Sequence, residues 1–201
     1  VGSRTKLFLN IGARVVAFEP QPNLCNHLKN HLDIVRKVKI EQLALGDQRS
    51  IKQMLICEAH VLSSLSKRWI NATQKSGRFS NYNWEKSIDV NVSTLDEQII
   101  KYGIPDFIKI DVEGYELEVL KGLSKEITCI VFEFTSEEIE QTFKCIDYLN
   151  SLSNCLFRVS FGEEHKFTRP WKSCIDFKGE LHNDCIDKSN CWGDIFVKLK
   201  K

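Results

Sequence analysis

The stretch from Asp106 to Gly114 limits the possible folds of this chain more than any other segment. Its apolar residues form a run typical of a buried strand, and carboxylates and a glycine follow just before a helical pattern begins. A second run, residues 14–18, delivers Glu19 into a proline-rich turn in the same way. Ligands of open α/β sheets bind beyond the carboxyl ends of the strands. The two runs therefore predict one shared crevice, with Glu19 and Asp111 beside it.

Predicted strands and helices alternate along the chain. Short β-branched runs predict strands, and apolar residues at three- and four-residue spacing predict helices. The expected strands span residues 14–18, 38–43, 89–92, 107–112, 127–134, 156–161 and 195–199, and the expected helices span residues 5–10, 24–32, 95–102, 114–123 and 137–149. Residues 51–86 fit neither pattern and are interpreted as an excursion from the sheet that could act as a lid. The alternation predicts an α/β fold with a mostly parallel sheet and helices on both faces.

Composition excludes several classes of partner. A chain of 201 residues with 42% apolar content can bury one substantial core, and its length fits one domain better than two. The 28 Lys and Arg residues nearly balance the 27 Asp and Glu residues, so no overall charge attracts nucleic acid or anionic membranes. No apolar run approaches the roughly 20 residues that cross a bilayer. We expect a single domain over residues 1–201, soluble and cytoplasmic, with no nucleic-acid or membrane partner; the sequence does not indicate an oligomeric state.

The eight cysteines fall into two groups. Five lie in or beside expected helices and strands, where reduced and packed thiols are typical: Cys25, Cys57, Cys129, Cys145 and Cys155. The other three lie in a polar segment near His165 and His182: Cys174, Cys185 and Cys191. A zinc site and, in an oxidising compartment, a disulfide are both open there, although the Cys-x-x-Cys spacing common in zinc sites does not occur.

Six short segments occur in order along the first two thirds of the chain. They are Ala17-Phe-Glu-Pro-Gln-Pro22, Ala44-Leu-Gly-Asp47, Leu62-Ser-Ser-Leu65, Ser93-Thr-Leu-Asp96, Pro105-Asp-Phe-Ile-Lys-Ile-Asp-Val-Glu-Gly114 and Phe132-Glu-Phe134. Together they resemble the FkbM family of S-adenosylmethionine-dependent methyltransferases. The resemblance implies a Rossmann-like class I methyltransferase fold and S-adenosyl-L-methionine as cofactor. It also implies methyl transfer, usually to a hydroxyl oxygen, here of a small-molecule or glycan acceptor.

The start of the chain departs from that family pattern. Family members resemble one another in an initial strand and a glycine-rich loop of the form Asp-x-Gly-Ala-Asn-x-Gly, and Val1-Gly2-Ser3 resembles only the tail of this loop. We therefore expect a domain that is N-terminally incomplete, without its first, central strand and without most of the glycine loop. Loss of a central strand would leave two unpaired strand edges. Such a fragment is expected to bind the cofactor poorly.

The resemblance implies a cofactor site made by Gly2, Glu19, Pro20 and Leu45. Glu19 follows Gly2 by about 17 residues, near the roughly 20-residue spacing at which Rossmann-type sites place an acid for the ribose hydroxyls. Its carboxylate would accept both hydroxyl protons, although it could also merely cap a loop. Pro20 could lie against the adenine, and the resemblance places the backbone near Leu45 at the adenine edge.

Asp111 is the strongest catalytic candidate, and the resemblance directs it toward the methyl donor or the acceptor. Glu133 lies near the end of the next expected strand and should neighbour Asp111 if the two strands pair. Two such carboxylates can raise one pKa and give a general base, or can bind a divalent cation. We favour catalysis by Asp111, assisted by Glu133 or Glu113, without a metal. Glu113 and Glu116 could also simply stabilise the first turn of the next helix.

Weaker candidates lie outside the regular elements. Ser63 and Ser64 could orient the acceptor or the cofactor carboxylate, or could only stabilise a turn. His60 could serve as a base, and Gly114 would let substrate or backbone approach closely. The tryptophans could line an acceptor pocket or pack in a core or interface: Trp69, Trp84, Trp171 and Trp192.

Two other functions stay open at this stage. A nicotinamide-dependent oxidoreductase would use a similar sheet, but its Gly-x-Gly-x-x-Gly fingerprint does not occur in the sequence. A non-catalytic domain could keep the fold as an interaction module, and the incomplete glycine loop would favour this alternative if Val1 were the natural start of the protein.

Overall fold

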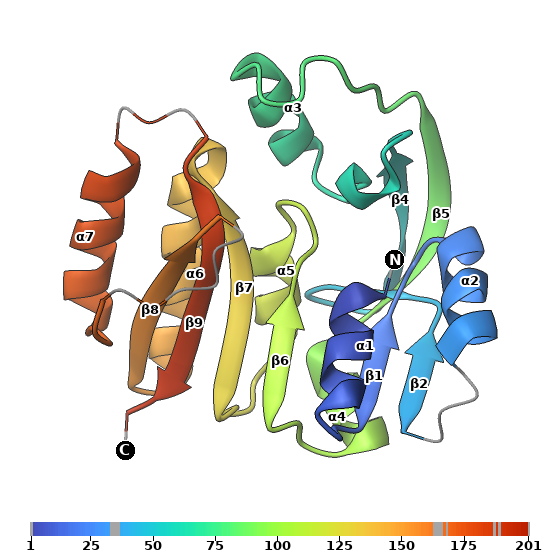
Figure 1. Cartoon of the computed structure of the whole chain (residues 1–201), viewed down its shortest axis with the longest axis horizontal. Coiled ribbons are helices and arrows are strands. Elements are labelled where there is room, and N and C mark those ends of the chain that lie inside the picture. Colours follow the sequence, from blue (N-terminus) through green and yellow to red (C-terminus); the bar gives the residue numbers. More distant parts are fainter. Residues whose placement is uncertain are drawn as a thin grey trace.

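The computed structural model describes residues 2–32, 37–162, 167, 169–186, 188 and 190–200 (Figure 1). The helices are α1 (Ser3–Asn10), α2 (Pro22–Leu32), α3 (Lys67–Lys75), α4 (Leu95–Tyr102), α5 (Glu116–Lys121), α6 (Ile139–Leu152) and α7 (Cys174–Cys185), with 3-10 turns η1 (His60–Leu62) and η2 (Ser136–Glu138). The strands are β1 (Val15–Phe18), β2 (Val38–Glu41), β3 (Ala44–Leu45), β4 (Ser50–Ile56), β5 (Lys86–Ser93), β6 (Phe107–Ile110), β7 (Cys129–Thr135), β8 (Cys155–Phe161) and β9 (Trp192–Leu199). The predicted α/β class is confirmed.

Among the described residues, the strands form three hydrogen-bonded groups, ordered β1-β2, β3-β5-β4 and β6-β7-β9-β8. The pairs β1–β2, β3–β5 and β6–β7 are parallel, whereas β4–β5, β7–β9 and β8–β9 are antiparallel. The expectation of a mostly parallel sheet was therefore wrong. Helix α6 carries the chain from β7 to β8, and β9 then returns after α7 to fill the position between them.

The segment expected to be irregular, residues 51–86, begins and ends in strands. β4 pairs with β5 over seven residues, from Ser50 opposite Val92 to Ile56 opposite Lys86. The sequence did not predict β4, because its apolar residues do not match the alternating buried and exposed positions of a strand. Ile51, for example, is apolar but 69% exposed. Between the two strands, α3 packs Trp69 and Ile70 into a small core of its own.

The main hydrophobic core lies between the β6-β7-β9-β8 sheet and helices α5, α6 and α7. Phe132 of β7, Phe157 of β8 and Ile195 of β9 are completely buried there. Because side chains alternate between the two faces of a strand, the residues next to them point to the opposite face. This second face therefore receives Glu133 and Asp194, and the sequence alternation in β6 places Lys109 there too. In Figure 1, α1 lies in front of the strands, and α5 and α6 lie behind them.

A disulfide joins Cys185 at the end of α7 to Cys191 just before β9, with 5.5 Å between their Cα atoms. It takes up two of the three thiols of the proposed zinc cluster, so the disulfide alternative replaces the zinc alternative. His165 lies outside the described residues. Cys25, Cys57, Cys145 and Cys155 are buried free thiols, as predicted, and Cys129 is partly buried. None of the described helices combines the length and the apolar character of a membrane span.

Candidate functional site

The site forms where β6 and β7 end side by side. The parallel register sets Ile110 opposite Phe132, so that Asp111 and Glu133 follow at the same level. In Figure 1 the arrowheads of β1, β6 and β7 point to the same edge of the molecule. The predicted pairing of the strands that carry Asp111 and Glu133 is confirmed, whereas the roles of these residues stay predictions.

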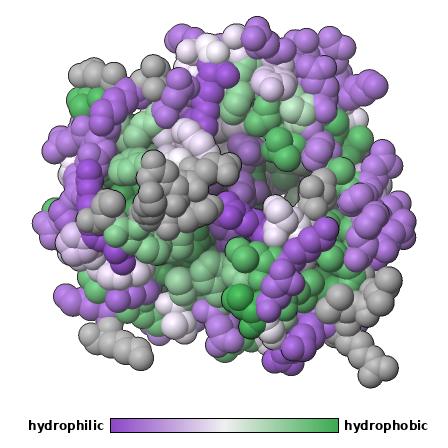
Figure 2. Space-filling view, in the orientation of Figure 1, coloured by the Kyte–Doolittle hydropathy of each residue, from purple (hydrophilic) through white to green (hydrophobic). Residues whose placement is uncertain are grey.

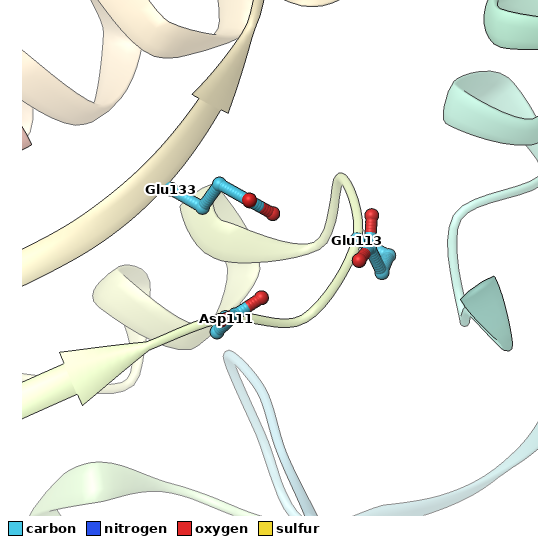
Figure 3. Close-up of side chains that lie close together, drawn as sticks. All are labelled: Asp111, Glu113 and Glu133. Carbon is cyan, nitrogen blue, oxygen red and sulfur yellow. The ribbon is translucent and has the colours of Figure 1, made fainter. Parts of the chain in front are cut away.

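Three carboxylates converge at this edge: Asp111, Glu113 and Glu133, hereafter the acid trio. One oxygen from each residue lies within 4.8 Å of the others. Figure 3 shows the three side chains facing a common space, Glu133 from β7 and the other two from the β6–α5 loop. Figure 2 shows hydrophilic surface at the centre of this face, between more apolar areas. Such a set of oxygen atoms can accept hydrogen bonds from hydroxyl groups, stabilise a positive charge, or bind a hard divalent cation.

Burial and mutual repulsion change the proton affinity of this cluster. Burial, together with the negative charge of Asp111, raises the pKa of Glu133 to about 8, although the Lys109 ammonium opposes the shift. Burial and the charges of Glu133 and Asp111 also raise the pKa of Glu113 well above its ordinary value. Carboxylates this close cannot all ionise at low cost. The acid trio therefore holds at least one proton near pH 7.

The β6–α5 loop has an unusual backbone that the sequence did not predict. Glu113 has φ 53° and Gly114 has φ 82°, and α5 begins only at Glu116. The expectation that Gly114 opens the helix, with Glu113 in its first turn, was therefore wrong. The left-handed conformation at Glu113 is sterically costly for a residue with a side chain and requires support from its surroundings.

Residues of the 51–86 segment supply that support. Ser64 Oγ donates a hydrogen bond of 2.6 Å to the carbonyl of Glu113, and Arg68 Nη2 donates one of 3.4 Å to the carbonyl of Gly114. The Trp69 side chain packs directly against Gly114 at a place where no Cβ would fit. Gly114 thus permits the close approach of the Trp69 side chain, whereas substrate or backbone was expected there, and Trp69 belongs to the core.

Glu116 braces the same loop from inside the protein. It is buried, and its Oε1 accepts hydrogen bonds of 3.3 Å from the backbone N–H groups of Val112 and Gly114. Burial raises its pKa to about 7 despite these bonds. Glu116 therefore stabilises the loop through these backbone contacts.

Two further charged residues border the acid trio, and neither was predicted from the sequence. Lys109 Nζ lies 3.5 Å from Asp111 Oδ2 and 2.6 Å from Asp194 Oδ1. Burial lowers the pKa of Lys109, but the charges of Asp111 and Asp194 more than offset it, so the net shift is upward. A lysine inside an apolar strand was a visible signal for Lys109. Asp194 gave no such signal, because residues 192–194 were not assigned to a strand.

The predicted cofactor residues lie at the ends of other elements. Glu19 follows β1, and its Oε1 accepts a 2.8 Å hydrogen bond from the Gln21 N–H. Gly2 precedes α1 with φ 77°. Leu45 lies in the short strand β3, which pairs with β5. Within the described part of the chain, no hydrogen bond or ion pair joins Gly2, Glu19, Pro20 or Leu45 to the acid trio.

The polar candidates of the 51–86 segment have structural partners. Ser63 Oγ accepts a hydrogen bond from the Cys57 N–H, and the Ser64 hydroxyl contacts the loop as described. The His60 side chain is exposed, and its carbonyl accepts a hydrogen bond from Gln21 Nε2. This last bond ties the segment to the turn that holds Glu19. The backbone around His60 therefore lies beside the predicted ribose site.

Comparison with known proteins completes the description of the site. The sequence matches the model of the FkbM methyltransferase domain over residues 3–159. Among solved structures, the chain is similar to methyltransferase FkbM from Methylobacillus flagellatus KT, with 16% sequence identity and a TM-score of 0.45. That likeness covers 96% of this chain but 40% of the other, so this chain spans less than half the length of that protein. A search of curated proteins finds no significant match. Because the family match extends over more than half of the 201 residues, the chain belongs to the FkbM methyltransferase family.

Proposed function

We propose that this chain transfers a methyl group from S-adenosylmethionine to a hydroxyl oxygen of a small molecule or glycan. The observation that carries the proposal is the convergence of the acid trio at the ends of two parallel strands in a member of a methyltransferase family. Ligands of open α/β sheets bind at this edge. The acceptor lies within reach of Asp111, the most accessible member of the trio, whose side chain is 44% exposed.

A Rossmann-like class I arrangement is part of the proposal. Two parallel pairs support it, β1–β2 with α1 and α2, and β6–β7 with α5 and α6. Among the described strands, β1 pairs with β2 alone and β6 pairs with β7 alone, so β1 and β6 each have one unpaired edge. A fold of this class places one further strand between these two edges.

Glu19 is the proposed ribose-binding residue. Its carboxyl group is half-buried, burial raises its pKa, and only Oε1 has a hydrogen-bond partner among the described residues. The other oxygen can accept hydrogen bonds from ribose hydroxyls. Pro20 offers an apolar surface to the adenine, while Gly2 and the backbone near Leu45 border the same region in this proposal. The residues that the chain presents therefore fit a nucleoside.

S-adenosylmethionine supplies an electrophilic methyl group on a positively charged sulfur. The acid trio stabilises positive charge nearby through its ionised members. Asp111 orients the acceptor hydroxyl and takes its proton as the oxygen forms its bond to carbon, and Glu133, which holds a proton near pH 7, donates a hydrogen bond that fixes Asp111 or the acceptor. Alignment of the two reactants supplies much of the acceleration, and a positioned base contributes typically 10²–10⁴-fold.

The test uses the full chain with isotopically labelled S-adenosylmethionine and a panel of sugars and hydroxylated small molecules. Asp111→Asn should lower turnover by roughly 10²–10⁴-fold with little change in cofactor affinity. Asp106→Asn is the matched control, because Asp106 is exposed at the opposite end of β6. Unchanged turnover in Asp111→Asn would remove Asp111 from the mechanism.

Calorimetry separates the competing functions. Glu19→Ala should weaken S-adenosylmethionine binding by roughly 10-fold or more, the usual effect of losing hydrogen bonds to a charged group. Glu58→Ala, at an exposed position, is the control. Binding of NAD in place of S-adenosylmethionine would indicate an oxidoreductase, and binding of neither would indicate an interaction domain. Chelation of divalent cations should leave turnover unchanged, because the proposed reaction uses no metal.

A further inference from the structure

A buried ion pair lies directly behind the acid trio. Lys109 Nζ and Asp194 Oδ1 are 2.6 Å apart, and their side chains are only 15% and 12% exposed. Asp194 comes from β9, outside the residues 3–159 that match the family model. The part of the chain beyond the family match therefore contributes a charged group to the surroundings of the site.

The sheet register explains how these two residues meet. Lys109 of β6 lies opposite Val131 of β7, and Asp194 of β9 lies opposite Glu133. All four side chains occupy the face of the sheet that points away from the main core. Lys109 reaches diagonally across β7, past Glu133, to Asp194.

The Lys109 ammonium lies between two carboxylates and is closer to one of them. It lies 2.6 Å from Asp194 but 3.5 Å from Asp111. Lys109 therefore forms a close pair with Asp194 and a looser ion pair with Asp111. Without Asp194 the ammonium would move closer to Asp111, because a desolvated ammonium requires an ionised partner. A closer pair would neutralise more fully the carboxylate that the proposed reaction uses.

We propose that Asp194 is a positioning residue that anchors the Lys109 ammonium on the β9 side, so that the Asp111 carboxylate stays available to the methyl-transfer site. This inference rests on the proposed function. A buried ion pair is a poor device for stability alone, since apolar residues of similar volume often serve as well or better. The short contact to Asp194 and the longer one to Asp111 instead favour a role in the site.

The test is Asp194→Asn, which keeps the shape and a hydrogen-bond acceptor but removes the charge. In its crystal structure, the distance from Lys109 Nζ to Asp111 should shorten from 3.5 Å to about 2.8 Å, the usual length of a charge-assisted hydrogen bond. Its kcat should fall by roughly 10-fold, in the range of coupling between directly interacting groups, while the calorimetric affinity for S-adenosylmethionine changes little. Asp184→Asn is the matched control, because it removes the charge that Asp184 of α7 presents to Arg169, in an ion pair separate from that of Lys109 and Asp194.

A double variant separates positioning from a structural role. Asp194→Asn with Lys109→Met removes the ammonium that would capture Asp111, so its kcat should exceed that of Asp194→Asn alone. An equal or lower kcat would contradict the inference. If Asp194→Asn does not fold, the double variant, which buries no unpaired charge, is compared with wild type, and a loss of kcat greater than 10-fold would contradict the inference.

The two proposals fail in different ways. Wild-type protein that transfers no methyl group to any acceptor would contradict the proposed function, and the Lys109–Asp111 distance in the Asp194→Asn crystal structure would then decide the inference. Active wild-type protein, together with unchanged kcat and an unmoved Lys109 in Asp194→Asn, would overturn the inference alone.

Discussion

Glu133 occupies an environment that opposes ionisation from two directions. Its carboxyl group is largely buried, and Asp111 and Asp194 add negative charge, while Lys109 is the cation that acts against them. A carboxyl group in such a position stays protonated to higher pH than in the unfolded chain. Protonation of Glu133 is therefore linked to folding.

This linkage predicts how stability changes with pH. The pKa of Glu133 is raised from 4.5 to about 8 in the folded state, so the folded protein holds a proton that the unfolded chain releases between these values. The stabilising contribution of protonated Glu133 to the free energy of unfolding is fully present below pH 4.5 and is lost as the pH rises through 8. Glu133→Gln removes this dependence. The free energy of unfolding of the variant should therefore rise relative to that of wild type as the pH increases from 5 to about 8.

Urea denaturation at several pH values measures this difference. Glu140→Gln is the control, because Glu140 is an exposed glutamate on α6. A constant difference between Glu133→Gln and wild type over the same pH range would show that Glu133 has an ordinary pKa.

Gly114 allows a second prediction about a single residue. Gly114→Ala should destabilise the protein by about 1–3 kcal/mol from its positive φ and by about 1–3 kcal/mol more from overpacking against Trp69. Gly103→Ala is a matched control, since Gly103 has φ 93° but no atom near the position of a Cβ. Thermal and urea unfolding should show the larger loss for Gly114→Ala. Equal losses would mean that Trp69 yields easily.

The sequence predicted part of the site for a clear physical reason. Asp111 follows one apolar run and Glu133 lies near the end of the next, and strand ends are where such sheets place functional groups. Glu113 was also a candidate, but its left-handed backbone was not predicted. Lys109 and Asp194 contribute through features that periodicity does not encode: a long side chain that crosses a strand, and the register of a distant strand. Geometry of this kind depends on tertiary contacts.

At the scale of elements, the sequence predicted which segments are helices and strands better than how the strands run. β6 and β7 were expected, and their parallel pairing follows from the connection through α5. The direction of β9 depends on α7 and on the open position between β7 and β8, and neither can be recognised from a local sequence pattern. β4 was not predicted, because exposed apolar residues interrupt the alternation of apolar and polar residues by which a strand is recognised.

The disulfide between α7 and β9 gives a prediction at this scale. Cys185 and Cys191 are six residues apart in sequence, so the bond closes a small loop and should stabilise the protein by about 2 kcal/mol, at the low end of the usual range. The variant with both cysteines changed to serine should lose this amount in urea denaturation, and reducing agent should have the same effect on wild type. Cys174→Ser, at a free thiol, is the control. Stability that is equal with and without reductant would contradict the prediction.

At the scale of the whole molecule, the proposed site draws on segments from both ends of the chain. Asp111 and Glu133 lie in its middle, Glu19 lies near its start, and Asp194 is supplied by its last strand. The same last strand joins β7 to β8, each through seven paired residues. The family match to residue 159 therefore does not mark the end of the folding unit.

A chain truncated after residue 159 tests this conclusion. It would keep every residue of the family match but lose β9 and α7, so the edges of β7 and β8 would be unpaired and the core would lose Ile195 and Val197. Exposed edges and a core cavity of this size exceed the usual net stability of a domain, about 5–15 kcal/mol. We expect no cooperative unfolding transition by circular dichroism and a tendency to aggregate in sedimentation experiments. A chain that ends at residue 199 is the control and should unfold like wild type, because it keeps all of β9. Cooperative unfolding of the shorter chain would show that the first 159 residues fold alone and that β9 is not needed for a stable core.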